Sequence, residues 1–537
     1  MSRFRGHKIP IADTQAFSKL VVDYAHGAEE LADFYGLRPD VRSFEAQMKA
    51  KAKFDSEHRY ILVKALTEQY GRLKAVQVDS EKVEKNVLAL EYANTFTVTT
   101  GHQLNLFTGP LYFWFKIVHA IRLARSLKRA YPDYDFVPVY WMATEDHDFA
   151  EINHIHLYGG TPRWNRPDGG AVGRMTLEGM DKVLEDLEEV LGPGNNADRL
   201  RDLFKRAYTE QHTLADATRY LVHEFFADDG LVIVDGDDPH LKALMHRAVG
   251  LEMKERVTHK ASSEAVAALD SAYHVQVNPR EINLFYLDDE GRNRLELHEK
   301  GWHVVDRDKL FTPESFDAER AAHPERFSPN VLMRPLYQEV ILPNLAYIGG
   351  GAEVAYWMEL KASFEAQGVP FPILFLRNSA MMVGSKENEK REKLGLSWTD
   401  LFQKTEGLVN ALVSEASNEN LDFSEYEETL NRLFDEMEQV ASRTEKSFEG
   451  AVRAQKQKQL NGLEKLQKRL LKAEKRKHDQ LVDRVRQLKE ALFPAGKLQE
   501  RYDNFIPYYL EYGSDYKKAL FDHLDPWTFD FHIIEES

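Results

Sequence analysis

The chain has 537 residues, is 43% hydrophobic and carries a formal net charge of −17 at pH 7, so it is long enough for two or three domains with sizeable cores. The acidic balance argues against a protein that binds nucleic acid over its whole surface, because phosphate binding needs a basic face. The chain has no cysteine, which excludes disulfides, thiolate metal sites and cysteine nucleophiles. It shows neither a signal-peptide stretch nor a run of about 18 apolar residues, so we expect a cytoplasmic protein with no nucleic acid or membrane as partner.

Residues 95–141 show a β-α-β pattern. The β-rich run Thr95–Thr100 is followed by a glycine turn, a helical stretch from Pro110 to about Ala130 with Thr108 as its N-cap, and the apolar run Phe136–Trp141. Further apolar strands are expected at Leu231–Asp235 and, after a helix over Tyr356–Gln367, at Phe371–Leu376. Strands that alternate with helices predict an α/β fold with a mostly parallel, Rossmann-like sheet.

The expected domains follow from changes in composition along the chain. Residues 1–385 form the Rossmann-like core, in which the more polar stretches at about 150–230 and 260–330 are insertions. Residues 386–495 are charged and helical, with leucines spaced as in coiled-coil arms that are antiparallel or dimerising, which predicts a homodimer. Residues 496–537 are rich in Tyr and Phe and are expected to pack back on the core.

The turn Gly101-His102-Gln103 follows a strand and precedes a helix. It therefore belongs to the edge where open α/β proteins bind ligands, and the helix N-terminus supplies N–H groups and a positive dipole for a phosphate or carboxylate. The alternative is a structural turn in which the histidine only bonds to the backbone.

An acidic cluster, Glu145-Asp146-His147-Asp148, begins shortly after the next strand and should face the same crevice. Such groups bind an ammonium, hold Mg²⁺ or accept a proton from an amine nucleophile. The alternative is a solvated acidic turn. His154 and His156 lie on an alternating run and are interpreted as strand side chains, so the sequence requires no metal.

Two later segments add candidate binding groups. Successive glycines allow close backbone approach to a ligand, and arginine clamps a carboxylate through two hydrogen bonds, although a tight turn and an edge salt bridge are the structural alternatives. The candidates are Arg334, Gln338, Glu339, Asn344, Gly349, Gly350 and Glu353 in the first segment, and Arg377, Asn378 and Ser379 at the end of the last apolar strand.

Several motifs in order resemble the bacillithiol synthase family of cysteine-adding ligases. They are Thr100–Gln103, Thr108–Tyr112, Glu145–Phe149, Glu151–His154, Arg334–Glu339, Leu342–Gly350, Leu470–His478 and Leu498–Arg501. The resemblance implies a Rossmann-like core with inserted connecting segments, related to class I aminoacyl-tRNA synthetase cores, and a dimerising coiled coil. It places Thr108 and Asn153 in the substrate site. The helix start at Gly109–Trp114 is more aromatic than the family pattern.

The same resemblance implies the last step of bacillithiol biosynthesis, in which L-cysteine is joined to the amine of glucosaminyl malate. Under this hypothesis Gly101 and His102 stabilise developing negative charge, Asp146 or Asp148 holds or deprotonates the amine, and Arg377 or Arg334 anchors a malate carboxylate. The resemblance also implies an ATP or ADP site near the junction of core and coiled coil, where the candidate residues are Gly384, Ser385, Lys386, Lys489 and Tyr502.

Two other functions are compatible with these patterns. One is a coiled-coil assembly protein whose sheet domain serves as a ligand-binding platform. The other is a nucleotidyltransferase acting on a sugar or an acid, because the same core supports both chemistries. The gathering of polar clusters at successive strand ends favours an enzyme over an assembly protein.

Overall fold

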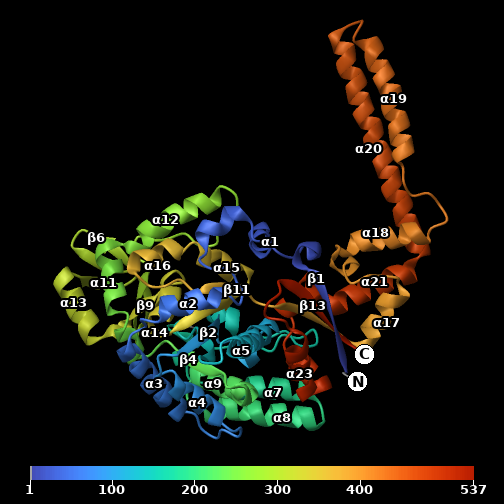
Figure 1. Cartoon of the computed structure of the whole chain (residues 1–537). Helices are drawn as coiled ribbons and strands as arrows, with labels where there is room; N and C mark the ends of the chain where they lie inside the picture. Colours follow the sequence, from blue (N-terminus) through green and yellow to red (C-terminus); the bar gives the residue numbers. More distant parts are fainter. Residues whose placement is uncertain (1–2, 168) are drawn as a thin grey trace.

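The computed structural model describes residues 3–167 and 169–537 as a large body from which a long helical arm projects (Figure 1). The arm consists of α19 (Ser424–Ala441) and α20 (Lys446–Lys477), and the two chain ends lie near each other on the body. Within the described ranges, no helix is long and apolar enough to cross a membrane.

A five-stranded parallel sheet forms the centre of the body. Its order is β11-β10-β2-β3-β4, and every neighbouring pair runs parallel. The strands are β2 (Thr95–His102), β3 (Asp135–Met142), β4 (Val232–Asp235), β10 (Asn344–Gly349) and β11 (Ile373–Leu376). This arrangement, together with the helical arm, confirms the predicted α/β class with a Rossmann-like core.

Strand β10 was not among the strands predicted from the sequence. It lies between β2 and β11, and all six of its residues are buried. Its first residue, Asn344, is a polar side chain in the core, and its Oδ1 accepts hydrogen bonds from Thr97 Oγ1 at 3.1 Å and Thr99 Oγ1 at 2.8 Å. Because the neighbouring strand β2 supplies these partners, a strand can begin at an asparagine that by itself favours a turn.

Two helix predictions need correction. Helix α5 (Tyr112–Ala130) begins after Leu111, with no side-chain cap. The predicted N-cap, Thr108, lies instead in a 3-10 turn (Leu106–Thr108) with φ of 68°, and its Oγ1 accepts a hydrogen bond from Trp114 Nε1 at 3.1 Å. The single helix expected over 356–367 is two helices, α15 (Gly351–Met358) and α16 (Lys361–Gln367).

Short helices precede and surround the central sheet. The N-terminal ones are α1 (Lys19–His26), α2 (Ser43–Lys51), α3 (Ser56–Gly71) and α4 (Glu81–Ala89). Between β3 and β4 the chain forms α6 (Phe149–Ile152), α7 (Met180–Leu191), α8 (Asn195–Lys205) and α9 (Leu214–Phe226). After β4 come α10 (Pro239–Ala243), α11 (His246–Glu255) and α12 (Val257–Asp270), and α13 (Pro313–Ala322) and α14 (Met333–Ile341) precede β10.

A second, antiparallel sheet is built within the stretch between α12 and α14. Its order is β8-β7-β6-β5-β9. The strands are β5 (Leu284–Asp288), β6 (Gly291–His298), β7 (Gly301–Val304), β8 (Leu310–Phe311) and β9 (Phe327–Pro329).

The helices after residue 385 divide between the body and the arm. Helices α19 and α20 pack against each other around Phe434, Ala441 and Val452. Within the predicted coiled-coil region, His478 separates α20 from α21 (Asp479–Leu492). Helix α21 then packs on α17 (Ser385–Lys393) and α18 (Thr405–Ala416).

The C-terminal segment returns to the body. Strand β13 (Asp530–Glu536) lies between β1 (Phe4–Pro10) and β12 (Ser379–Val383) in a three-stranded sheet, antiparallel to β1 and parallel to β12. Before it come α22 (Ile506–Tyr512) and α23 (Ser514–His523), and the 3-10 turn Gln499–Arg501 lies beside β12.

Candidate active site

The carboxyl ends of all five parallel strands open into one cavity of about 970 Å³. Each strand end supplies lining residues: Gly101 and His102 from β2, Ala143–His147 after β3, Gly236 after β4, Gly350 after β10, and Arg377 after β11. The cavity therefore lies where doubly wound sheets bind ligands, and it brings together residues from each of the three polar clusters that the sequence had placed at strand ends.

The antiparallel sheet forms the opposite wall. Arg292 on β6 is central to this wall: its guanidinium lies 4.0 Å from the centre of the Phe285 ring and donates to Ser328 Oγ at 2.9 Å. The same guanidinium is 3.1 Å from His147 Nδ1, which comes from the β3 side of the cavity. The second insertion thus encloses the site, a role that composition alone did not indicate.

His102 lies at the base of the cavity between two aromatic rings. The ring centres of Tyr112 and Phe113 are 5.3 and 5.2 Å from the imidazole, and Nε2 has no hydrogen-bond partner within the described structure. Burial, followed by the positive charge of Lys116, lowers the pKa of His102 to about 3. His102 is therefore neutral at physiological pH and can act on a substrate only as a hydrogen-bonding imidazole, not as a cation.

An ion pair that the sequence reasoning missed lies beside His102, with its lysine buried and its glutamate 27% exposed. Lys116 Nζ donates to the Gly101 carbonyl at 2.7 Å and lies 2.5 Å from Glu353 Oε2. Glu353 also accepts hydrogen bonds from Gly350 N at 2.8 Å and from Tyr347 Oη at 2.7 Å. Burial would raise the pKa of Glu353, but the Lys116 ammonium outweighs it, so that pKa is lowered and the carboxylate is ionised.

The signal for this pair was present in the sequence. Lys116 is a charged residue within Phe113–Val118, on a helix whose neighbouring positions are apolar and buried. A lysine is almost never fully buried unless it is paired, so this one position pointed to a partner in the core. The pair holds the ends of β2 and β10 together at the edge of the cavity.

The acidic cluster separates into residues that line the cavity and one that does not. Glu145 is buried against Lys242, and burial raises its pKa against the effect of that ammonium. Asp146 accepts from Gln103 Nε2 at 2.7 Å and lines the cavity. Asp148 instead caps α6, where its Oδ1 accepts from Glu151 N at 3.3 Å, so its predicted place in the crevice is wrong.

The two candidate arginines differ in their partners. Arg377 donates to Glu500 Oε1 at 2.7 Å, and both side chains are almost completely buried, so much of its hydrogen-bonding capacity is already used. Arg334 lies 5.6 Å from the Tyr347 ring centre and donates to Tyr356 Oη at 3.3 Å. Within the described ranges Arg334 has no carboxylate in ion-pair contact, which leaves it the better candidate for binding a substrate anion.

Several predicted substrate-binding residues belong to the core instead. Gln338, Glu339 and Asn344 form a buried network in which Glu339 pairs with Lys51 at 2.7 Å. None of the three lines the cavity. Their hydrogen bonds are made within the protein, so the structure places them in the core and not in the predicted crevice.

Four other residues predicted to bind substrate lie near strand or helix ends and also outside the cavity lining: Asn153, Gly349, Asn378 and Ser379. Asn378 Nδ2 donates to the Asp525 carbonyl at 2.7 Å, and Ser379 Oγ lies 3.3 Å from Glu500 Oε1. Asn153 Oδ1 accepts from Arg163 at 3.1 Å. Gly349 ends β10, where a Cβ would lie 2.9 Å from the Glu353 Cβ, so it provides close packing. Thr108, described above, belongs with these structural residues.

The five residues predicted to bind a nucleotide do not share one set of contacts. Gly384, Ser385 and Lys386 begin α17, where Ser385 N donates to Glu536 Oε2 at 3.3 Å. Lys489 is buried and donates to the carbonyls of Leu401 and Gln403. Tyr502 stacks on His156 with ring centres 4.2 Å apart. These contacts show no partner shared by all five residues, and the nucleotide site stays a prediction.

The charge of the cavity lining favours an anionic ligand. Three carboxylates line it, namely Glu145, Asp146 and Glu353, and the cationic side chains are Lys116, Arg280, Arg292, Arg294, Arg334, Arg377 and Arg501. Glu145 and Glu353 are already paired with lysines. Low-dielectric walls strengthen the remaining positive field, so carboxylate or phosphate groups are the chemistry that this cavity suits.

Comparison with known proteins agrees with this architecture. Residues 5–378 match the model described as "Bacillithiol biosynthesis BshC, N-terminal Rossmann-like domain", and residues 380–536 match "Bacillithiol biosynthesis BshC, C-terminal coiled-coil domain". A protein of Christiangramia forsetii named "Putative cysteine ligase BshC" is 47% identical over 98% of both chains. Proteins of the same name from Flavobacterium johnsoniae and Salinibacter ruber are 46% and 32% identical, over 96% of this chain in each case. These matches confirm the family resemblance seen in the sequence, and the chain belongs to the bacillithiol biosynthesis BshC family.

Proposed function

We propose that the chain is a ligase that joins the carboxyl group of L-cysteine to the amino group of glucosaminyl malate and so forms bacillithiol, the last step of that biosynthesis. The observation that carries the proposal is the cavity at the carboxyl edge of the sheet, which combines an excess of cations with a carboxylate, Asp146, that has no lysine or arginine in ion-pair contact within the described residues. Glucosaminyl malate has malate carboxylates and an amine, and the cavity offers partners for both. Membership of the bacillithiol biosynthesis BshC family supports substrates that belong to bacillithiol biosynthesis.

The proposed binding mode places the malate carboxylates against arginine. Arg334 is held by Tyr356 and aromatic rings and has no carboxylate in ion-pair contact within the described chain, so a substrate carboxylate would complete its hydrogen bonds. Arg501 reaches the same cavity from the C-terminal segment. Two arginines from separate segments suit a substrate that carries two carboxylates.

The amine would bind near Asp146. Only a neutral amine attacks a carbonyl, so a carboxylate that first holds the ammonium and then accepts its proton lowers the barrier. Gln103 donates to Asp146 and fixes its orientation. The amide bond forms as the amine nitrogen displaces the activated carboxyl oxygen, and the neutral imidazole of His102, which lines the cavity, would donate a hydrogen bond to the oxygen that becomes negative.

The test is to incubate purified protein with cysteine, glucosaminyl malate and ATP and to follow the thiol product by mass spectrometry. A parallel reaction without ATP determines whether the nucleotide is needed to activate the carboxylate. His102→Ala and Asp146→Asn should reduce product formation at least about tenfold, and Asp148→Asn, a matched change outside the cavity, should not. Full activity of both cavity variants would refute the assignment.

The same experiment separates the two competing functions. A nucleotidyltransferase would release pyrophosphate and transfer a nucleotide to the sugar or acid, without forming the thiol product. An assembly protein would form neither product. The second case has less support, because a platform has no need for the Lys116–Glu353 pair and for an arginine without a carboxylate partner in the described chain, both at one cavity.

We also propose that the arm makes a homodimer. Four apolar side chains of α19 are 44–62% exposed in the single chain: Tyr426, Leu433, Met437 and Val440. Covering such a series is a strong reason for helices to associate. Sedimentation of the wild-type protein should give twice the chain mass, and Leu433→Lys with Met437→Lys should shift it to one chain mass. A wild-type monomer at all concentrations tested would contradict this proposal.

A further inference from the structure

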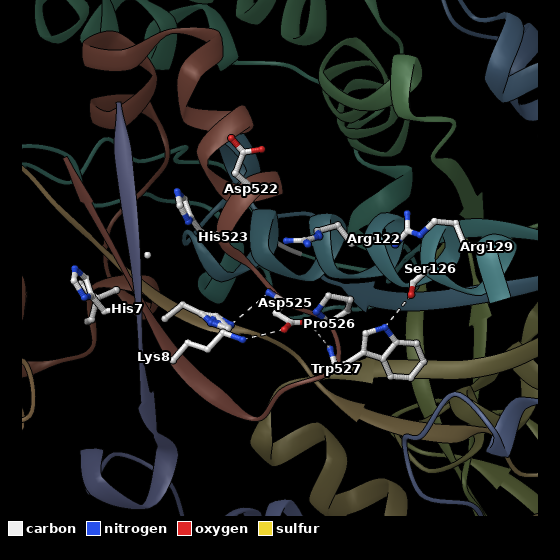
Figure 2. Close-up of a pocket in the computed structure, with 13 residues that line it drawn as sticks. His7, Lys8, Arg122, Ser126, Arg129, Asp522, His523, Asp525, Pro526 and Trp527 are labelled. Carbon is white, nitrogen blue, oxygen red and sulfur yellow. Dashed lines mark hydrogen bonds and ion pairs between the residues drawn. The ribbon is translucent and has the colours of Figure 1, made fainter. Parts of the chain in front are cut away.

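A second cleft, separate from the active-site cavity, lies between β1, helix α5 and the turn that follows α23 (Figure 2). Its volume is about 380 Å³. Figure 2 shows Arg122, Ser126 and Arg129 along α5, with Trp527 facing Ser126 and Lys8 entering from β1. None of these side chains has a role in the proposed ligase chemistry.

The positive charge of this cleft is only partly neutralised. Residues 122, 126 and 129 are spaced by four and three, so they share one face of α5. The two carboxylates of the cleft are already paired, Asp525 with Lys8 at 2.9 Å and Asp522 with Lys518. Within the described ranges, neither Arg122 nor Arg129 contacts a carboxylate, and Arg122 donates only to the Leu524 carbonyl. Two guanidinium groups therefore remain for an external anion, on a chain whose net charge is −17.

The wall opposite α5 is held in place by hydrogen bonds. Trp527 Nε1 donates to Ser126 Oγ at 2.9 Å, and Asn378 Nδ2 donates to the Asp525 carbonyl at 2.7 Å. The buried ring of His532 lies below, with Nε2 at 3.4 Å from both Asp525 N and Asn378 Nδ2. Because both neighbours are N–H donors, Nε2 is the acceptor and the proton is on Nδ1. The turn from Leu524 to Trp527 is thus fixed without any ligand.

We propose that this cleft binds a small molecule through a phosphate or carboxylate group held between Arg122 and Arg129. A guanidinium donates two parallel hydrogen bonds to such a group, which a lysine cannot do. Ser126 accepts from Trp527, so its own hydroxyl proton is available to donate to the same anion. A volume of about 380 Å³ is at the lower end of the range for small-molecule sites, roughly 300–1,000 Å³, so the ligand is a compact metabolite.

The test uses calorimetry on the full-length protein with two probes, inorganic phosphate and succinate. The Arg122→Gln/Arg129→Gln double variant should bind the preferred anion at least about tenfold more weakly than wild type. Arg125→Gln is the matched control, because Arg125 is on the same helix but pairs with Asp229 at 2.5 Å and does not line the cleft. The titrations are repeated with Arg334→Gln added to each variant. Arg334 lines the active-site cavity and not the cleft, so binding that weakens with this change belongs to the cavity.

Each result has a defined meaning. Loss of phosphate binding in the double variant identifies a phosphorylated ligand, and loss of succinate binding identifies a carboxylic acid. The proposal is overturned if neither affinity depends on the two arginines, or if Arg125→Gln weakens binding equally, since the effect would then be one of general charge. Arg129 is exposed and has no side-chain partner in the described chain, so Arg129→Gln alone should fold normally and weaken binding at least about threefold; an unchanged affinity would also overturn the proposal.

Discussion

Replacing Glu339 by glutamine tests whether this residue is part of the core or of the substrate site. The Glu339 and Lys51 side chains are 0% and 1% exposed, and Oε2 lies 2.7 Å from Nζ. Glutamine keeps an oxygen for Asn344 Nδ2 but leaves the lysine ammonium buried without its counter-charge. Breaking a buried pair in this way costs about 3–5 kcal/mol, a large part of the stability of a typical domain, which is roughly 5–15 kcal/mol.

The measurement is the urea midpoint of the first unfolding transition, followed by circular dichroism. Glu45→Gln is the control, because Glu45 pairs at 2.7 Å with Lys49 on the same helix as Lys51, but both side chains are exposed. That exposed pair is worth at most about 0.5 kcal/mol, so its loss should barely move the midpoint. The folded Glu339→Gln protein should keep its KM for glucosaminyl malate. An unchanged midpoint with a raised KM would refute the reasoning and return Glu339 to the substrate site.

Three further predictions concern the cavity and pH. Lys116→Met should reduce product formation at least about tenfold, because Glu353 loses its ion pair; full activity would show that the pair does not shape the cavity. Arg501→Gln should raise the KM for glucosaminyl malate about tenfold with little change in kcat, and a fall in kcat alone would contradict a binding role. Burial lowers the pKa of His119 to about 3, whereas the pKa of a histidine in the unfolded chain is about 6.5. Below pH 6.5 the unfolded state therefore binds more protons than the folded state, so the free energy of unfolding decreases as the pH is lowered. At pH 5 this costs about 2 kcal/mol, so between pH 7 and 5 the urea midpoint of His119→Gln should fall less than that of wild type; equal falls would count against the argument.

The predicted strands and the polar clusters at their ends were visible in the sequence because apolar β-rich runs and helical spacing are local patterns. Thr95–Thr100 and Phe136–Trp141 fall within β2 and β3, and their carboxyl ends carry the turns that line the cavity. Strand β10 was missed because its polar first residue and terminal glycines look like a loop. The threonines of β2, which come from a distant part of the chain, supply hydrogen-bond partners for that first residue.

The assignments of individual side chains were less successful for a related reason. A motif shows that polar residues occur together, but not which of them already have partners inside the protein. Arg377 and Arg334 look equivalent in the sequence, yet Arg377 is paired with Glu500, 123 residues later. Asp146 and Asp148 are two residues apart, and the start of α6 uses the second as a cap. Partners of this kind are fixed by the tertiary structure, so spacing cannot predict them.

The pairing of Arg377 with Glu500 also explains how the arm and the active site are connected. The turn Gln499–Arg501 follows the helical arm in the chain, and Gln499 bonds to both N and O of Met382 on β12, at 2.8 and 3.0 Å. Glu500 fixes Arg377, and Arg501 enters the cavity. The polypeptide must therefore leave the core, build the arm and return before the cavity is complete. Removing the arm together with residues 496–537 should abolish substrate binding, whereas shortening only the tip of the α19–α20 hairpin should leave the cavity intact and affect association alone.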